Sequence, residues 1–73
     1  MATEAFISEL GMRATLSIGA WSANVDTGEF RAWAVYSGFD VVHVGGSLSK
    51  FLLKDDADCQ FTMLTWSDTL PER

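Results

Sequence analysis

The alternation of apolar and polar residues predicts a sheet in the middle of the chain. Between residues 13 and 25 the apolar positions recur with period two, but their parity changes from even to odd around Gly19. A single flat strand cannot bury both sets on one face, so we expect a bulge at Gly19 and Ala20. Residues 26–28 have the composition of a turn, and residues 30–36 alternate again. The pattern predicts a central hairpin with arms 13–25 and 30–36.

Shorter apolar runs on either side predict the remaining elements. Residues 4–11 predict a helix of about two turns that must dock on another element, with a strand as the alternative. Residues 39–44 predict a third strand, because β-branched side chains favour a pleated surface. Ser47 then caps a predicted helix over residues 48–54, and residues 59–66 predict the last strand.

These elements combine into one α+β domain over residues 1–73. We expect about four mostly antiparallel strands, with one or two short helices packed on one face of the sheet. Hydrophobic residues make up 48% of the chain and three of them are tryptophan, which favours a packed core over disorder. A chain this short buries only about 60% of the surface that it exposes when unfolded, so its margin of stability is small.

The single cysteine, Cys59, bears on the compartment in which the protein works. A secreted domain of this size usually needs disulfides, and one thiol cannot form a disulfide within the chain. The N-terminal residues lack a basic region followed by an apolar run, and no apolar run approaches the ~20 residues of a membrane span. We therefore expect a protein of the reducing cytoplasm that does not enter a membrane.

Charge narrows the class of partner. Ten acidic residues oppose five basic ones, which gives a net charge of −5. Nucleic-acid binding relies on lysine and arginine to displace counterions from phosphates, so we expect no direct contact with nucleic acid. A protein with a basic surface is the expected partner, with acids that speed the encounter and an aromatic side chain as anchor. The predicted protein-binding residues are Asp26, Glu29, Trp33, Asp55, Asp56 and Asp58.

Each part of this predicted surface has a plainer alternative. The acids of residues 55–58 lack the central glycine and the closing glutamate of a calcium loop, and a solvated loop is their structural interpretation. Trp33 and Val35 are expected on the sheet face opposite the helices, as a dimer or partner surface. Core packing is the alternative for Trp33, because a domain this small needs its aromatic area inside.

A second candidate site lies at the predicted junction of a strand and a helix, and consists of Gly45, Gly46, Ser47 and Lys50. Free N–H groups at a helix N-terminus bind phosphate or carboxylate, and a hydroxyl and an ammonium group would add to them. The segment is not a Walker loop, because it lacks the Gly-Lys-Ser/Thr ending. A tight turn followed by a helix cap is the structural alternative.

The sequence contains no recognisable catalytic set. His43 is the only histidine and Cys59 the only cysteine, so a zinc site would need carboxylates to complete it. A domain of this size can hardly form a deep pocket. We expect no enzyme activity, no metal and no cofactor, and we expect Cys59 to be a small buried hydrophobic residue.

The leading hypothesis is a non-enzymatic protein-binding module that acts by stoichiometric binding. Small phage-encoded proteins that block host defence or transcription machinery, anti-CRISPR proteins among them, share this profile as a class. In this hypothesis the acids cover a basic surface that otherwise binds nucleic acid. The alternatives are a small-molecule binder that uses residues 45–50, and a self-assembling structural subunit, a homodimer included.

Overall fold

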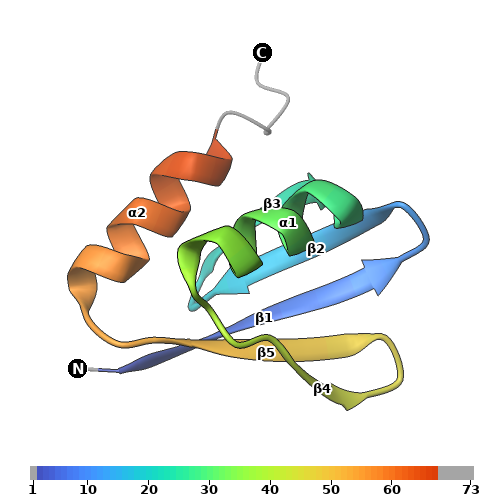
Figure 1. Cartoon of the computed structure of the whole chain (residues 1–73), viewed down its shortest axis with the longest axis horizontal. Helices are drawn as coiled ribbons and strands as arrows, with labels where there is room; N and C mark the ends of the chain where they lie inside the picture. The colour runs from blue at the N-terminus through green and yellow to red at the C-terminus, as the bar shows by residue number, and fades with distance from the viewer. Residues whose placement is uncertain (1, 68–73) are drawn as a thin grey trace.

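A five-stranded antiparallel sheet carries two helices on one of its faces in the computed structural model, which describes residues 2–67 (Figure 1). The strands follow the order β3-β2-β1-β5-β4 across the sheet. The elements along the chain are β1 (Thr3–Leu10), β2 (Arg13–Ile18), β3 (Trp21–Asp26), α1 (Thr27–Ser37), β4 (Val42–Gly45), β5 (Leu48–Leu53) and α2 (Asp56–Ser67). The predicted α+β class is confirmed, with five strands rather than about four.

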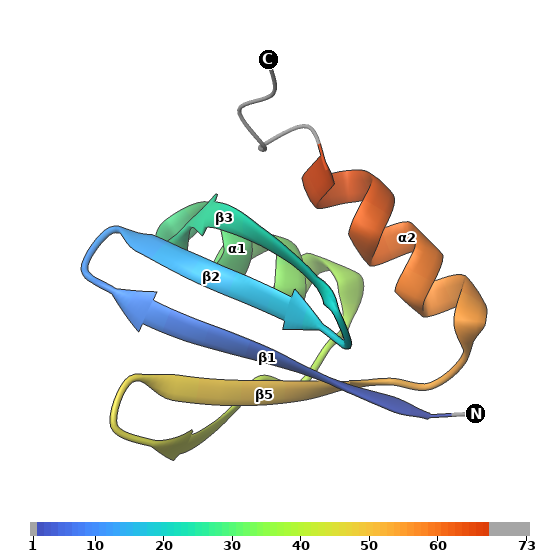
Figure 2. The ribbon, with the colours of Figure 1, turned by 180° about the vertical axis from the view of Figure 1, so that it is seen from behind.

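The strand alternation separates a buried face of the sheet from an open one. Ala5 of the central strand β1 lies opposite Ile18 of β2 and Phe51 of β5. These side chains, with Ile7 and Leu16, are buried on the side that the helices cover. Figure 2 shows the other face of the sheet, over which no described element lies. The core is therefore a single layer between the sheet and the two helices.

The predicted central hairpin lies in a different place from the one expected. Residues 13–25 do not form one bulged strand, because the chain reverses at Gly19, whose φ is +59°, to make the β2–β3 hairpin. Leu16 then lies opposite Ala23, and Ile18 lies opposite Trp21, so even positions pair with odd ones. The change of parity in the sequence is therefore the signature of a tight turn.

Residues 30–36, the predicted second arm, belong to helix α1. Asp26 acts as the N-cap, since its Oδ2 accepts the backbone N–H of Glu29 at 3.0 Å. Phe30 and Ala34 are buried one turn apart. Gly38 ends the helix with a φ of 86°. The segment after β3 is therefore a helix cap, although its residues also have the composition of a hairpin turn.

Three shorter elements were predicted with the wrong period. Residues 4–10 of the predicted helix 4–11 lie in strand β1, and Gly11 lies in the turn after it, so the alternative prediction of a strand is the one confirmed. Residues 48–54 were predicted as a helix, but Ser49, Phe51 and Leu53 are buried with period two in β5. Residues 59–66 were predicted as a strand, but they lie in α2. The predicted strand 39–44 is confirmed only in part, because β4 begins at Val42.

The burial pattern of α2 explains the last of these corrections. Cys59, Thr62 and Trp66 are buried at intervals of three and four residues, which is the helical period. Asp55 precedes the helix, and its Oδ1 accepts the backbone N–H of Asp58 at 3.0 Å. Short apolar runs satisfy both periods, and the cap then decides between them.

Candidate binding groove

A groove of about 520 Å³ runs along the outer edge of β5. Its walls come from the segment that follows α1, from β5 itself and from the start of α2. We call it the β5 groove, and define it by residues 37–40, Val42, residues 50–52, Lys54, Asp58, Phe61 and Glu4. Lys50 and Leu52 reach it from the open face of the sheet, whereas Phe51 reaches it from the face under the helices. The groove therefore follows the strand edge itself.

The β5 groove exists because β4 is shorter than the strand that it pairs with. Val42, the first residue of β4, lies opposite Lys50. In the same register Leu52 would lie opposite residue 40, which is outside the strand. Figure 1 shows β5 continuing past the start of β4. The second half of β5 therefore lacks a strand partner on its outer side among the described residues.

The floor of the groove is aromatic. Phe39, Phe51 and Phe61 line it and belong to one cluster of rings. The ring centroids of Phe39 and Phe51 are 5.3 Å apart, and the ring of Phe61 stacks on Trp33 at 5.8 Å. Phe61 is half exposed, at 50% of its surface. Contact with a ligand would therefore remove part of an aromatic surface from water.

The end of α1 fixes the position of Phe39. The backbone N–H of Phe39 donates to the carbonyl of Ala34 at 2.9 Å, and that of Gly38 donates to Val35 at 3.1 Å. This is the Schellman arrangement, which commonly brings the residue after the glycine against the last turn of the helix. Here the Phe39 ring packs on Trp33 at 5.4 Å. The cap thereby holds one wall of the groove against β5.

Two ion pairs and one free acid stand at the rim. Lys50 Nζ is 3.3 Å from Glu4 Oε2, and Lys54 Nζ is 3.2 Å from Asp58 Oδ2. Asp40 is exposed and forms no ion pair with the described residues. Because both lysines are already neutralised, the groove presents a net negative rim to an approaching group.

The structure divides the predicted acidic residues between two ends of the molecule. Asp26 and Glu29 lie at the start of α1, and Asp55, Asp56 and Asp58 lie at the start of α2. Figure 1 shows these helix starts on opposite sides of the molecule. Asp26 lies in register with the last residue of β1, whereas Asp55 follows Leu53, which pairs with the first, and eight extended residues span on the order of 25 Å. Only the second group borders the β5 groove. The predicted set is therefore not one surface.

Trp33 was predicted on the open face of the sheet, but it lies on helix α1. It is half-buried, and its ring contacts those of Phe30 and Trp66 at 5.8 Å and 5.6 Å, in addition to the groove rings. Val35 is 79% exposed on the outer side of the helix. Core packing, the alternative interpretation of Trp33, is the one that the structure supports.

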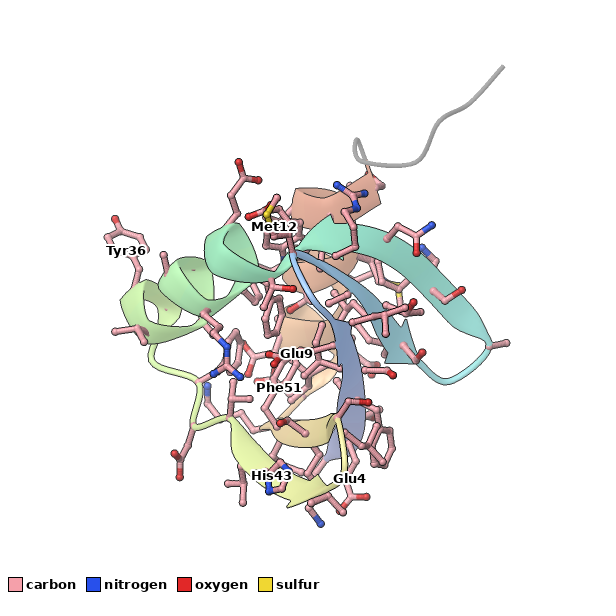
Figure 3. All side chains as sticks on the ribbon, turned by 90° about the vertical axis from the view of Figure 1, so that its right-hand side faces the viewer. Glu4, Glu9, Met12, Tyr36, His43 and Phe51 are labelled. Atoms are coloured by element: carbon pink, nitrogen blue, oxygen red, sulfur yellow. The ribbon has the colours of Figure 1, made fainter. Side chains whose placement is uncertain are left out.

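The predicted junction of a strand and a helix after Gly45 is a β-hairpin turn. Gly46 has a φ of +56°, and strand β5 begins at Leu48. His43 Nε2 is 2.8 Å from the carbonyl oxygen of Gly46, and Figure 3 shows the imidazole on β4 beside this turn. No helix begins at Ser47, so the segment offers no helix N–H groups to an anion. The structural premise of the predicted phosphate or carboxylate site is wrong.

Metal ligands, helix length and the thiol of Cys59 also bear on function in the described part of the chain. Among residues 2–67, no group of three or more histidine, cysteine, aspartate or glutamate side chains is placed to hold a metal ion. Neither α1 nor α2 has the length and apolar character needed to cross a bilayer. Cys59 is buried as predicted, and its thiol is free.

Several residues of the groove carried no prediction. Asp40, Leu52 and Phe61 gain their roles from the place where β4 begins, which is a property of the folded sheet. Phe39 had a local signal, because it follows a glycine at the end of a helical pattern. Comparison with protein-family models, curated proteins and solved structures gives no significant match, so the geometry of the groove carries the functional argument alone.

Proposed function

We propose that this protein is a non-enzymatic binding module that holds a basic segment of a protein partner in the β5 groove. The observation that carries the proposal is the coincidence of three features at one place: an aromatic floor, a strand edge without a partner and an acidic rim. Each is common alone, but together they provide apolar contact, backbone pairing and charge selection. A stoichiometric inhibitor of a nucleic-acid-binding protein fits these properties.

The distribution of charge supports a basic partner. Eight acidic residues are described, and Glu4, Glu9 and Asp58 pair with lysine or arginine. The acids without such a partner are Asp26, Glu29, Asp40, Asp55 and Asp56. Three of these five lie at the end of the molecule that holds the groove. A basic partner would be steered toward this end by the local field.

The expected division of labour is that charge sets the rate and the rings set the affinity. Exposed ion pairs contribute only about 0–1 kcal/mol each, because water and salt screen them. Burial of one bulky apolar side chain contributes about 1.5–3 kcal/mol. The partner segment should therefore carry an apolar residue for the floor as well as basic residues for the rim.

Capture of binding proteins from a bacterial lysate tests this proposal. Phe61→Ala removes a half-exposed floor ring, and Leu64→Ala is the matched control, since Leu64 lies on the same helix, is 71% exposed and does not line the groove. We expect one stoichiometric partner that elutes at rising salt, that Phe61→Ala loses and that Leu64→Ala keeps. Equal capture by both variants would place binding elsewhere. Recovery of the bait alone would contradict the proposal.

Self-association is a second candidate, favoured by the open sheet face. Leu10 is 84% exposed on this face, and Leu52 is 54% exposed. A homodimer that joins two such faces would remove both side chains from water. Sedimentation at increasing concentration tests it: a dimer that Leu10→Glu dissociates supports the homodimer, and a monomer at every concentration rejects it. The buried single thiol is consistent with either candidate in a reducing cytoplasm, the compartment that we propose.

A further inference from the structure

We propose that the partner segment binds the β5 groove as an added β-strand, paired with the backbone of Leu52. The inference rests on the proposed function and specifies its geometry: the occupant is an extended segment with an apolar side chain for the ring floor and lysine or arginine beside it. Three observations carry it, namely the direction of the free backbone groups, the limits of the free edge and the two faces from which the groove is lined.

The hydrogen-bond pattern shows where the free backbone groups point. The backbone N–H of Glu9 donates to the carbonyl of Ser47 at 2.9 Å, and these residues extend the register of β1 and β5 by one position beyond its last pair, Ser8 and Leu48. Bonded pairs alternate along an antiparallel ladder, so the odd-numbered residues of β5 direct their N–H and C=O groups toward β1. The even-numbered residues therefore direct theirs outward. Lys50 meets Val42 there, whereas Leu52 meets no residue of β4.

The free edge is bounded on both sides. On one side β4 begins at Val42, opposite Lys50. On the other side the backbone N–H of Lys54, the next residue that points outward, donates to Asp58 Oδ2 at 3.3 Å. The N–H and C=O of Leu52 thus form one vacant pairing position between two occupied ones. One residue of an extended ligand would fill this position with two hydrogen bonds, and about three ligand residues, or about 10 Å, would lie in the groove.

The register also predicts where the ligand side chains go. A residue opposite Leu52 would lie on the open face of the sheet with it, because paired residues share a face. Its two neighbours would point to the other face, where Phe39, Phe51 and Phe61 line the groove. The ligand should therefore have its bulky apolar residue next to the paired residue. Basic residues at the ends of the ligand segment would meet Asp40 and Asp56, which form no ion pair with a lysine or arginine among the described residues.

The rest of the β5 edge is less suited to an added strand than the part next to Leu52. Exposed strand edges attract further strands, and natural proteins commonly shorten or distort them. The register of β4 and β5 shifts between His43 and Gly45, so this part of the edge is irregular. The segment of β5 beyond Lys50 keeps a regular register with β1 on its inner side, and its outer side borders the β5 groove. It is thus an edge that is both regular and accessible.

Selection of peptides from a random displayed library on the full chain tests the inference. We expect enriched peptides with one bulky apolar residue, nearby lysine or arginine and no helical spacing of apolar residues. N-methylation of the ligand amide that pairs with Leu52 should reduce affinity about tenfold or more, whereas N-methylation of the next amide, which points away from β5, should change it far less. Hydrogen exchange of the Leu52 amide should slow on binding.

The outcomes separate this inference from the proposed function. Peptides that compete with the captured protein but leave exchange at Leu52 unchanged, or whose affinity falls equally on both N-methylations, would overturn strand addition and leave the binding module intact. Enriched peptides with apolar residues at i, i+3 and i+4 would do the same, because they indicate a bound helix. No enrichment of any peptide, together with recovery of the bait alone from a lysate, would overturn both.

Discussion

The two helices begin with the same local device, but their starts have different surroundings. Asp26 caps α1 and Asp55 caps α2, each through a hydrogen bond of 3.0 Å to a backbone N–H three residues later. The first turn of α1 also carries one acidic residue, Glu29, and that of α2 carries two, Asp56 and Asp58. The difference between the two ends is therefore one of tertiary structure, and it shows why a cluster of acids alone does not define a binding site.

The start of α1 is docked on the sheet. The backbone N–H of Thr27 donates to the carbonyl of Met12 at 2.8 Å, and its hydroxyl donates to Gly11 at 3.0 Å. Figure 3 views the molecule from this end and shows Met12 beside the start of the helix. One turn later Arg31 meets Glu9 of β1 at 2.6 Å. These contacts attach the first turn of α1 to the β1–β2 turn and to β1, and none of the residues that make them lines the β5 groove.

The start of α2 instead borders a hollow. Asp58 and Phe61 face the β5 groove across from Phe39, and the strand between them has an open edge. A ligand would find unsatisfied backbone, aromatic surface and free acids there. Equal changes at the two ends should therefore affect stability equally, whereas only changes at the α2 end should affect binding.

The largest expected effect comes from removing a ring that belongs to both the core and the groove. Phe51 is 2% exposed and contacts Phe30 and Phe39 at 5.6 Å and 5.3 Å. Phe51→Ala should lower the free energy of unfolding by about 3–5 kcal/mol, because it loses apolar burial and leaves a cavity. Met12→Ala, at a 77% exposed position of the other end, should change it by less than about 0.5 kcal/mol. Urea unfolding measures both free energies, and similar values for the two variants would contradict the placement of Phe51 in the core.

A smaller effect is expected from the two helix caps. Asp26→Ala and Asp55→Ala should each lower the free energy of unfolding by about 1 kcal/mol, since each leaves a helix N–H without its acceptor. Thermal or urea unfolding of the two variants should therefore agree, whereas only Asp55→Ala should weaken capture of the partner. A loss of capture by Asp26→Ala at equal stability would show that the α1 end also binds.

An effect of similar size and opposite sign is expected on the buried side of α2. Thr62 is fully buried, and its hydroxyl has no hydrogen-bond partner among the described residues. Thr62→Val keeps the shape of the side chain and removes a polar group that lost its water on folding, so it should raise the free energy of unfolding by about 1 kcal/mol. If urea unfolding shows a lower free energy of unfolding for Thr62→Val, the hydroxyl forms a hydrogen bond in the folded protein. Binding should not change, because Thr62 does not line the groove.

Two signals in the sequence indicated the observed fold but were open to a second interpretation. The parity change between residues 13 and 25 indicated a tight turn as clearly as a bulge, and the β2–β3 pairing shows which was right. Asp26 and Glu29 have the spacing of a helix cap, and Phe30 and Ala34 have that of a helix face, but Gly28 also fitted a hairpin. The class of fold was predictable because both interpretations place a sheet under helices.

The groove was not predictable in the same way. It arises because β4 begins at Val42 while β5 extends to Leu53, and a register between strands is not visible in either strand alone. The acids of residues 55–58 were singled out from composition, and the structure places Asp58 in the groove. No residue next to Leu52 in the sequence indicates that its backbone has a role in binding. Its proposed role depends on a vacancy in the ladder, which only the folded sheet contains.

The most direct test of the central claim compares one charge reversal at each end. Asp56→Lys and Glu29→Lys change the same charge at exposed acids in the first turn of α2 and of α1. Both variants should fold as the parent does, with partner affinity measured side by side at low and high salt. We predict that Asp56→Lys weakens binding and reduces its dependence on salt, while Glu29→Lys leaves both unchanged. Equal loss in the two variants, or loss only in Glu29→Lys, would contradict the assignment of binding to the β5 groove.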